Sequence, residues 1–159
     1  MKSYASNTSN LNSEMFSKDF VEFIGLLNKN DVQYLIVGGY AVGLHGYPRY
    51  TGDLDIWILP QQENATKVLA ALRDFGFGSL NISLEDLTKE NNVIQLGYPP
   101  FRIDLMTSID GVNFSDCYTN RKEIVIEGLT VNFIGYDDLI KNKKASGRHQ
   151  DLGDIDNLK

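Results

Sequence analysis

Three aspartates lie in apolar, strand-like runs, and their spacing suits them to hold a divalent cation. Asp53 and Asp55 begin the run DLDIWI, and Asp104 lies in the run FRIDLM. Because side chains alternate along a strand, Asp53 and Asp55 share one face while Leu54 points to the other. Neighbouring carboxylates repel one another and lose solvation, and a cation between them relieves both costs. Oxygen-only ligands suit Mg²⁺, which completes its shell with waters and phosphates.

Each acidic element also has a simpler interpretation. An Asp-x-Asp pair is common at a solvated strand edge, and Asp104 alone could be a surface residue paired with Arg102. The three acids together are more specific than any one of them. If the two strands are neighbours, they form the ligand set for two divalent ions.

A glycine pair, Gly38-Gly39, stands between a β-rich run and a short helical run. Glycine allows the backbone to approach a ligand closely, and a helix N-terminus presents free N–H groups and partial positive charge. This junction suits a phosphate, although such a pair is also common as a tight turn.

The elements that must position these residues follow from hydrophobic periodicity. Helical spacing predicts helices over about 17–30, 40–45, 65–75 and 136–146, and a last one from Asp151. Compact β-rich runs predict strands at 34–37, 53–59, 93–96, 101–106, 122–126 and 129–134. This order predicts an α/β (α+β) fold, in which helices pack on a mixed sheet. We expect residues 1–15 to be a disordered polar tail and residues 16–159 to be one domain.

Composition limits the classes of partner. The chain has 159 residues and a formal net charge of −6, which argues against indiscriminate binding to nucleic acid. No apolar run approaches the ~20 residues of a membrane helix, so we expect no membrane partner. The single cysteine, Cys117, fits a reducing cytoplasm. Any phosphate ligand must then be met by a local basic cluster or a metal ion.

Residues 38–58, GGYAVGLHGYPRYTGDLDIWI, resemble the catalytic motif of the nucleotidyltransferase superfamily, which has the polymerase beta-like fold. That motif has a glycine pair, a helix, Asp-x-Asp on a strand and a third Asp on a later strand, which Asp104 matches. The chain is most similar to stand-alone bacterial members related to abortive-infection toxins and antitoxins. In those proteins Arg-x-Thr precedes the acidic pair, as Arg49-Tyr50-Thr51 does here, and a Lys-rich helix precedes Gly-Arg and Asp, as in residues 141–151. The resemblance spans about residues 19–159.

The resemblance implies transfer of a nucleoside monophosphate from a nucleotide triphosphate to a protein, RNA or small-molecule acceptor. It makes Asp53, Asp55 and Asp104 both catalytic residues and ligands of Mg²⁺ or Mn²⁺. The residues that it implies for nucleotide binding are Gly38, Gly39, Arg49, Thr51, Lys144 and Arg148.

Two other functions stay open. The first is a catalytically weak or inactive partner protein of a toxin–antitoxin system, because the glycine pair replaces the Gly-Ser of the best-characterised enzymes. The second is an aminoglycoside-type modifying enzyme, against which the short chain counts because it has no obvious second domain for the acceptor. The retained acids favour catalysis over the first.

Overall fold

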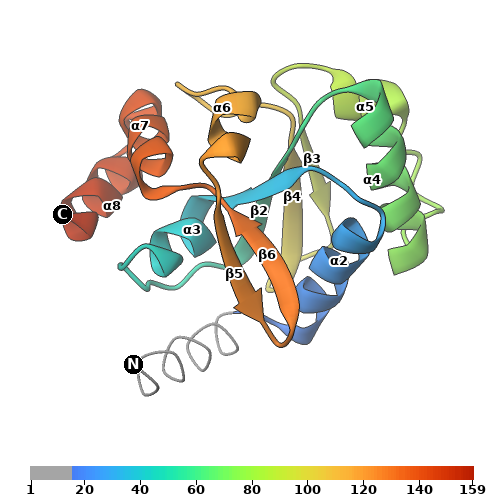
Figure 1. Ribbon diagram of the computed structural model, residues 1–159, viewed down its shortest axis with the longest axis horizontal. Coiled ribbons are helices and arrows are strands. Elements are labelled where there is room, and N and C mark those ends of the chain that lie inside the picture. The colour runs from blue at the N-terminus through green and yellow to red at the C-terminus, as the bar shows by residue number, and fades with distance from the viewer. Residues whose placement is uncertain (1–15) are drawn as a thin grey trace.

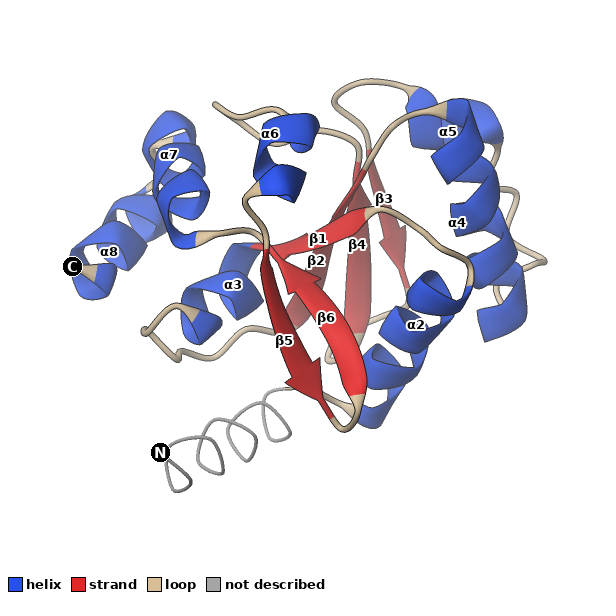
Figure 2. Cartoon of the chain, in the orientation of Figure 1, coloured by secondary structure: helices blue, strands red, loops and turns tan. Residues whose placement is uncertain are grey.

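A six-stranded mixed sheet forms the centre of the part of the chain that the computed structural model describes, residues 16–159 (Figures 1 and 2). Its order is β3-β4-β2-β1-β6-β5. The strands are β1 (Tyr34–Val37), β2 (Asp53–Ile58), β3 (Val93–Leu96), β4 (Arg102–Met106), β5 (Lys122–Ile126) and β6 (Leu129–Phe133). The helices are α2 (Lys18–Lys29), α3 (Gly38–Leu44), α4 (Gln62–Phe75), α5 (Leu84–Thr88), α6 (Phe114–Thr119), α7 (Tyr136–Ser146) and α8 (His149–Leu158).

Both parallel and antiparallel pairings occur in this sheet. Strand β2 runs antiparallel to β1 on one side and parallel to β4 on the other, while β1 is also parallel to β6. The two remaining pairs, β3 with β4 and β5 with β6, are antiparallel. The predicted α/β fold with a mixed sheet is therefore confirmed.

One face of the sheet forms the hydrophobic core with two helices. Leu54, Ile56 and Ile58 of β2 are fully buried and belong to the same cluster as the apolar sides of α2 and α4. Helix α2 begins where the Ser17 side chain accepts a hydrogen bond from the Phe20 N–H, and this is an ordinary N-cap. Helices α4 and α5 lie on the opposite side of the molecule from α7 and α8 (Figure 1). The other face of β2, which carries the acids, is thus left for a site.

The structure differs from the predicted elements mainly in its helices, and α4 begins at Gln62, three residues before the predicted start. Helix α3 begins at Gly38, so the glycine pair forms its first turn instead of a separate turn before it. Two short helices, α5 and α6, were not predicted, because five or six residues are too few to display a helical period. The last helix begins at His149, two residues before the predicted start. The predicted disordered tail, residues 1–15, lies outside the described residues.

Candidate active site

The three aspartates lie on one face of two neighbouring strands. In the parallel pair of β2 and β4, Asp55 is opposite Asp104, and Asp53 is opposite Arg102. Opposed residues on paired strands point to the same face of the sheet. The strands are neighbours, as the sequence predicts, and the register puts two carboxylates side by side.

The guanidinium of Arg102 lies between two of these carboxylates. Its Nη2 donates to Asp53 Oδ2 at 2.6 Å and to Asp104 Oδ2 at 3.2 Å, and its Nε donates to Asp104 Oδ1 at 3.0 Å. The hydrogen bond with Asp104 is the largest cause that raises the pKa of Arg102 above its ordinary value. Asp53 and Asp104 therefore share one counter-charge that is supplied by a side chain of the protein itself.

Asp55 is in a different situation. Among residues 16–159 the Asp55 carboxylate has neither a hydrogen-bond partner nor an ion-pair partner, although the carboxylates of Asp53 and Asp104 have both. Burial raises the pKa of Asp55 to about 7, and the charges of Asp104 and Asp53 contribute to the rise. Burial also raises the pKa of Asp104, against the opposing effect of Arg102. The site thus contains one carboxylate that is costly to ionise until a cation arrives.

The glycine pair packs directly against the acidic strand. A Cβ on Gly38 would overlap the Asp55 carboxylate, and one on Gly39 would overlap the Thr51 side chain. Gly38 also has φ +68°, in the left-handed region that favours glycine. The Thr51 hydroxyl in turn donates to the Asp53 carbonyl oxygen at 3.4 Å. This geometry gives both glycines a packing reason that is independent of any ligand.

A buried ion-pair cluster joins α7 and α8 to the loop before β2. Lys143, only 5% exposed, contacts Asp151 and Asp154, both at 3.1 Å. Arg49 forms a bidentate pair with Asp154 at 2.8 and 3.1 Å, and Arg148 pairs with Asp151 at 2.8 and 3.2 Å. Although burial alone would raise it, the pKa of Asp151 is lowered, because Arg148 and Lys143 donate hydrogen bonds to it.

This cluster lies within electrostatic reach of the aspartates. The charge of Lys143 opposes the rise in the pKa of Asp55 that burial causes. The pKa of Arg148 is raised mainly by its hydrogen bond with Asp151, and the charge of Asp55 adds to that rise. The Arg148 side chain is 73% exposed, so it remains accessible while it pairs with Asp151. Arg148 is thus a cation near the acidic site that also faces solvent.

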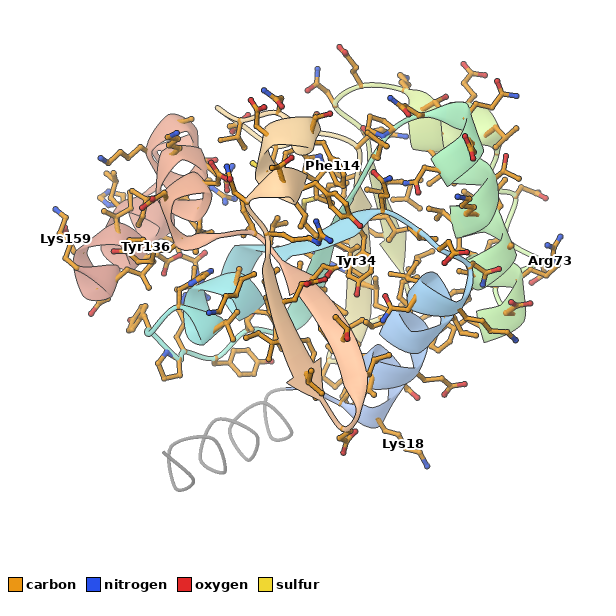
Figure 3. All side chains as sticks on the ribbon, in the orientation of Figure 1. Lys18, Tyr34, Arg73, Phe114, Tyr136 and Lys159 are labelled. Carbon is orange, nitrogen blue, oxygen red and sulfur yellow. The ribbon has the colours of Figure 1, made fainter. Side chains whose placement is uncertain are left out.

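The structure places the predicted lysine elsewhere. Lys144 is exposed and lines an outer groove of about 430 Å³ between α7 and α8, together with Tyr136, Lys141 and Lys159. Figure 3 labels Tyr136 and Lys159 on this side of the molecule. Helix α7 ends at Ser146, and Arg148 is the N-cap of α8, so Lys144 and Arg148 do not share one continuous helix face.

Sequence reasoning missed the roles of Lys143 and Asp154. The alternative pair of Asp104 with Arg102 is present, but the contact of Arg102 with Asp53 was not predicted. Lys143 lies four residues after the buried Leu139, so it falls on the inner face of α7, and this spacing was a usable signal. Arg102 and Asp104 are two residues apart on a strand, which predicts a shared face. No local signal pointed to Asp154, because its partner Arg49 is 105 residues away.

The donor set suits a divalent ion in type and in register. All the candidate ligands are carboxylate oxygens, which Mg²⁺ and Mn²⁺ prefer, and the Asp55 carboxylate has no partner among residues 16–159. In the described part of the chain, however, no three acidic, histidine or cysteine side chains are arranged to hold a metal ion. Arg102 takes the position of a cation between Asp53 and Asp104. The residues therefore match such an ion in donor type, whereas their arrangement in this structure is that of carboxylates bound to Arg102.

No helix in residues 16–159 combines the length and the apolar character that crossing a membrane requires. No curated protein matches the sequence significantly.

Three solved structures have the same fold. The lincosamide antibiotic adenylyltransferase LnuA, with lincomycin bound, is 18% identical with a TM-score of 0.55, and the alignment covers 90% of this chain and 96% of that one. A putative nucleotidyltransferase from Thermotoga maritima is 14% identical with a TM-score of 0.55, covering 86% and 83%. An antigenic nucleotidyltransferase-like protein from Paracoccidioides brasiliensis is 19% identical with a TM-score of 0.51, covering 90% and 75%.

The family to which the chain belongs is identified by its sequence. Residues 18–159 match a family described as nucleotidyltransferase of unknown function (DUF6036). That match covers almost the whole of the described chain, and the fold agrees with it. The chain is therefore a member of this nucleotidyltransferase family.

Proposed function

We propose that this protein uses Mg²⁺ or Mn²⁺ to transfer a nucleoside monophosphate from a nucleotide triphosphate to an acceptor hydroxyl or amine. The observation that carries the proposal is the environment of the Asp55 carboxylate. This carboxylate is unpartnered among residues 16–159, lies opposite Asp104, and has its pKa raised to about 7. A carboxylate that weakens the folded state in this way is typical of a functional site.

In this proposal Asp53 and Asp55 hold the divalent ions, and Asp104 completes the ligand set on the acceptor side. Bound divalent ions would neutralise the triphosphate and lower the pKa of the acceptor hydroxyl. Asp104 is also the group that accepts the acceptor's proton.

The phosphates belong next to the glycine pair. Gly38 and Gly39 bring the backbone of α3 close to the acidic strand, where free N–H groups of the first helical turn favour an anion. Arg49 and Thr51 border this turn, and Arg49 is held there by its hydrogen bond to Asp154. Arg148 supplies an accessible cation.

Lys144 is the weakest member of the predicted nucleotide site. It lines the outer groove with Tyr136 and Lys141, whereas Lys143 lies within electrostatic reach of Asp55. That Lys144 binds the nucleotide stays a prediction, and variants of Lys143 and Lys144 test it.

The length of the chain does not count against a small-molecule acceptor. LnuA, whose printed name makes it an adenylyltransferase of lincosamide antibiotics, is covered to 96% by this chain. An acceptor of that class needs no additional domain. A protein or RNA acceptor fits the same chemistry, because any of these presents a hydroxyl or amine.

A non-catalytic partner protein, such as one member of a toxin–antitoxin pair, is the second candidate. One observation favours it: Arg102 gives Asp53 and Asp104 a structural reason to exist without metal. Asp55 separates the two functions, because no described residue neutralises it directly.

A transfer assay with nucleotides labelled at different phosphates tests the proposal. The protein is incubated with Mg²⁺, a cell extract and each nucleotide triphosphate, labelled at either the α- or the γ-phosphate. We expect label from the α-phosphate alone to reach an acceptor, and Asp55→Asn to abolish the transfer. Transfer of the γ-label would indicate a kinase-type reaction, and an absence of transfer with all four nucleotides would favour the non-catalytic candidate.

A further inference from the structure

We propose that Arg102 is a tethered counter-ion that closes the acidic site to free metal and releases it to a metal–nucleotide complex. The inference rests on the proposed function, because it assumes that the three aspartates hold a metal. The structure contributes the arrangement itself: one guanidinium makes three hydrogen bonds of 2.6 to 3.2 Å to two of the three carboxylates.

The backbone places Arg102 for this role. Arg102 begins β4 two residues before Asp104 and directly opposite Asp53, so all three side chains share one face. The planar guanidinium offers donors in a fork that matches a carboxylate, and Asp104 receives two of them. A lysine here would offer a single point charge and could not make the same pair of parallel bonds.

Arg102 and a metal ion compete for the same oxygens. Both oxygens of Asp104 and one of Asp53 already accept hydrogen bonds from Arg102. A divalent ion that entered while Arg102 stayed would meet a positive charge in hydrogen-bond contact with its ligands. Metal binding therefore requires those three hydrogen bonds to break, which weakens the affinity for free metal.

Arg102 can leave without disturbing the core. Its side chain is 27% exposed, whereas that of Asp104 is 8% exposed, so the guanidinium lies on the solvent side of the pair. The buried cluster offers no replacement, because Lys143 is held between Asp151 and Asp154. When Arg102 turns outward, no other cationic side chain among residues 16–159 forms an ion pair with the three aspartates, so a metal ion can take its place.

A nucleotide triphosphate removes the cost of that movement. It brings about four negative charges to the mouth of the site, and a displaced guanidinium can pair with phosphate oxygens as it did with carboxylate oxygens. Metal and nucleotide should therefore bind synergistically in the wild type. The device makes metal entry conditional on the substrate that needs it.

Mn²⁺ titration with and without nucleotide measures this coupling. Free Mn²⁺ is counted by electron paramagnetic resonance in wild type, Arg102→Met and Arg102→Lys, alone and with α,β-methylene analogues of the four nucleotide triphosphates. Arg73→Met is the matched control, because it removes the same charge from an exposed position of α4, which packs on the sheet face opposite the aspartates.

We expect Arg102→Met to bind Mn²⁺ alone roughly tenfold or more tightly than the wild type does. This factor corresponds to the free energy of a hydrogen bond to a charged group. The gain in Mn²⁺ affinity that the nucleotide analogue produces should shrink by a similar factor. Arg102→Lys should lie between the two, and Arg73→Met should match the wild type.

Equal Mn²⁺ affinity in wild type and Arg102→Met would overturn the role of Arg102 and leave the proposed function intact. If neither the wild type nor any variant binds Mn²⁺, with or without nucleotide, the metal site is refuted and the proposed function with it. Thermal unfolding guards against a folding defect. Without metal Arg102→Met should melt below the wild type, and Mn²⁺ should raise its melting temperature by more than that of the wild type.

Discussion

Gly38 lies against the carboxylate of Asp55, so closely that any Cβ at position 38 would overlap Asp55 Oδ2. The contact joins the first turn of α3 to the second acid of β2. It means that the strand–helix junction and the acidic site are one structural unit. A change on either side should be felt on the other.

Gly38→Ala should destabilise the protein by about 1–2 kcal/mol or more, because alanine is strained in the left-handed region and its Cβ would also displace Asp55. Gly25→Ala is the control: Gly25 lies within α2 with open space around it, and we expect a gain of up to ~1 kcal/mol. Urea denaturation measures both. If the contact matters, Asp55→Ala should reduce the cost of Gly38→Ala; full additivity in this double-mutant cycle would contradict the contact.

The metal-free protein should depend on pH through Asp55. Its pKa is raised to about 7 in the folded state, above the ordinary value of about 3.9. As pH rises from about 4 to 7, the unfolded chain releases this proton first, so the contribution of Asp55 lowers the free energy of unfolding across that window. Asp55→Asn removes the effect and should gain stability relative to wild type between pH 5 and pH 8. The same difference at both pH values, measured with chelator present, would show that Asp55 ionises normally.

Two adjacent lysines should respond very differently to truncation. Lys143→Met leaves the buried carboxylates of Asp151 and Asp154 short of a partner, and breaking a buried pair in this way costs about 3–5 kcal/mol. Lys144→Met changes an exposed residue and should stay within about 0.5 kcal/mol of wild type. Chemical denaturation of the two variants decides the point. A large loss of stability in Lys144→Met would mean that the surface around Lys144 is covered in solution.

Nucleotide affinity tests the predicted basic residues separately from stability. If Arg148 contacts the triphosphate, Arg148→Lys should weaken nucleotide binding with Mg²⁺, because lysine cannot form a bidentate fork. If Lys144 contacts it, Lys144→Glu should cost roughly 1–3 kcal/mol. Fluorescence titration with a labelled nucleotide measures both. Given the position of Lys144 in the outer groove, an effect at Arg148 alone would assign Lys144 to a different surface.

The sequence was sufficient where a pattern was local. The alternation in DLDIWI predicted that Asp53 and Asp55 share a face, and β2 begins at Asp53 as expected. The apolar run before Gly38-Gly39 predicted β1 correctly. These features depend on neighbours in the chain, which a sequence displays directly.

What the sequence could not supply was pairing across the chain. Nothing in the run FRIDLM indicates that Arg102, rather than a metal, contacts Asp53, which lies 49 residues away. The choice between Lys143 and Lys144 depended on which face of α7 is buried, and α8 settles that by placing Asp151 and Asp154 there. Such contacts are set by the packing of separate elements, so local periodicity can place Lys143 on the inner face of α7 but cannot name its partners.

Calorimetry can show whether Asp53, Asp55 and Asp104 bind a metal–nucleotide complex, as we propose. Mg²⁺ with each α,β-methylene nucleotide triphosphate is titrated into the wild type and into Asp55→Asn, with a parallel experiment in excess chelator. We expect saturable binding of at least one nucleotide to the wild type, which is lost in chelator and weakened at least about tenfold in Asp55→Asn. Binding that survives both chelator and Asp55→Asn, or no binding of any nucleotide by the wild type, would contradict it.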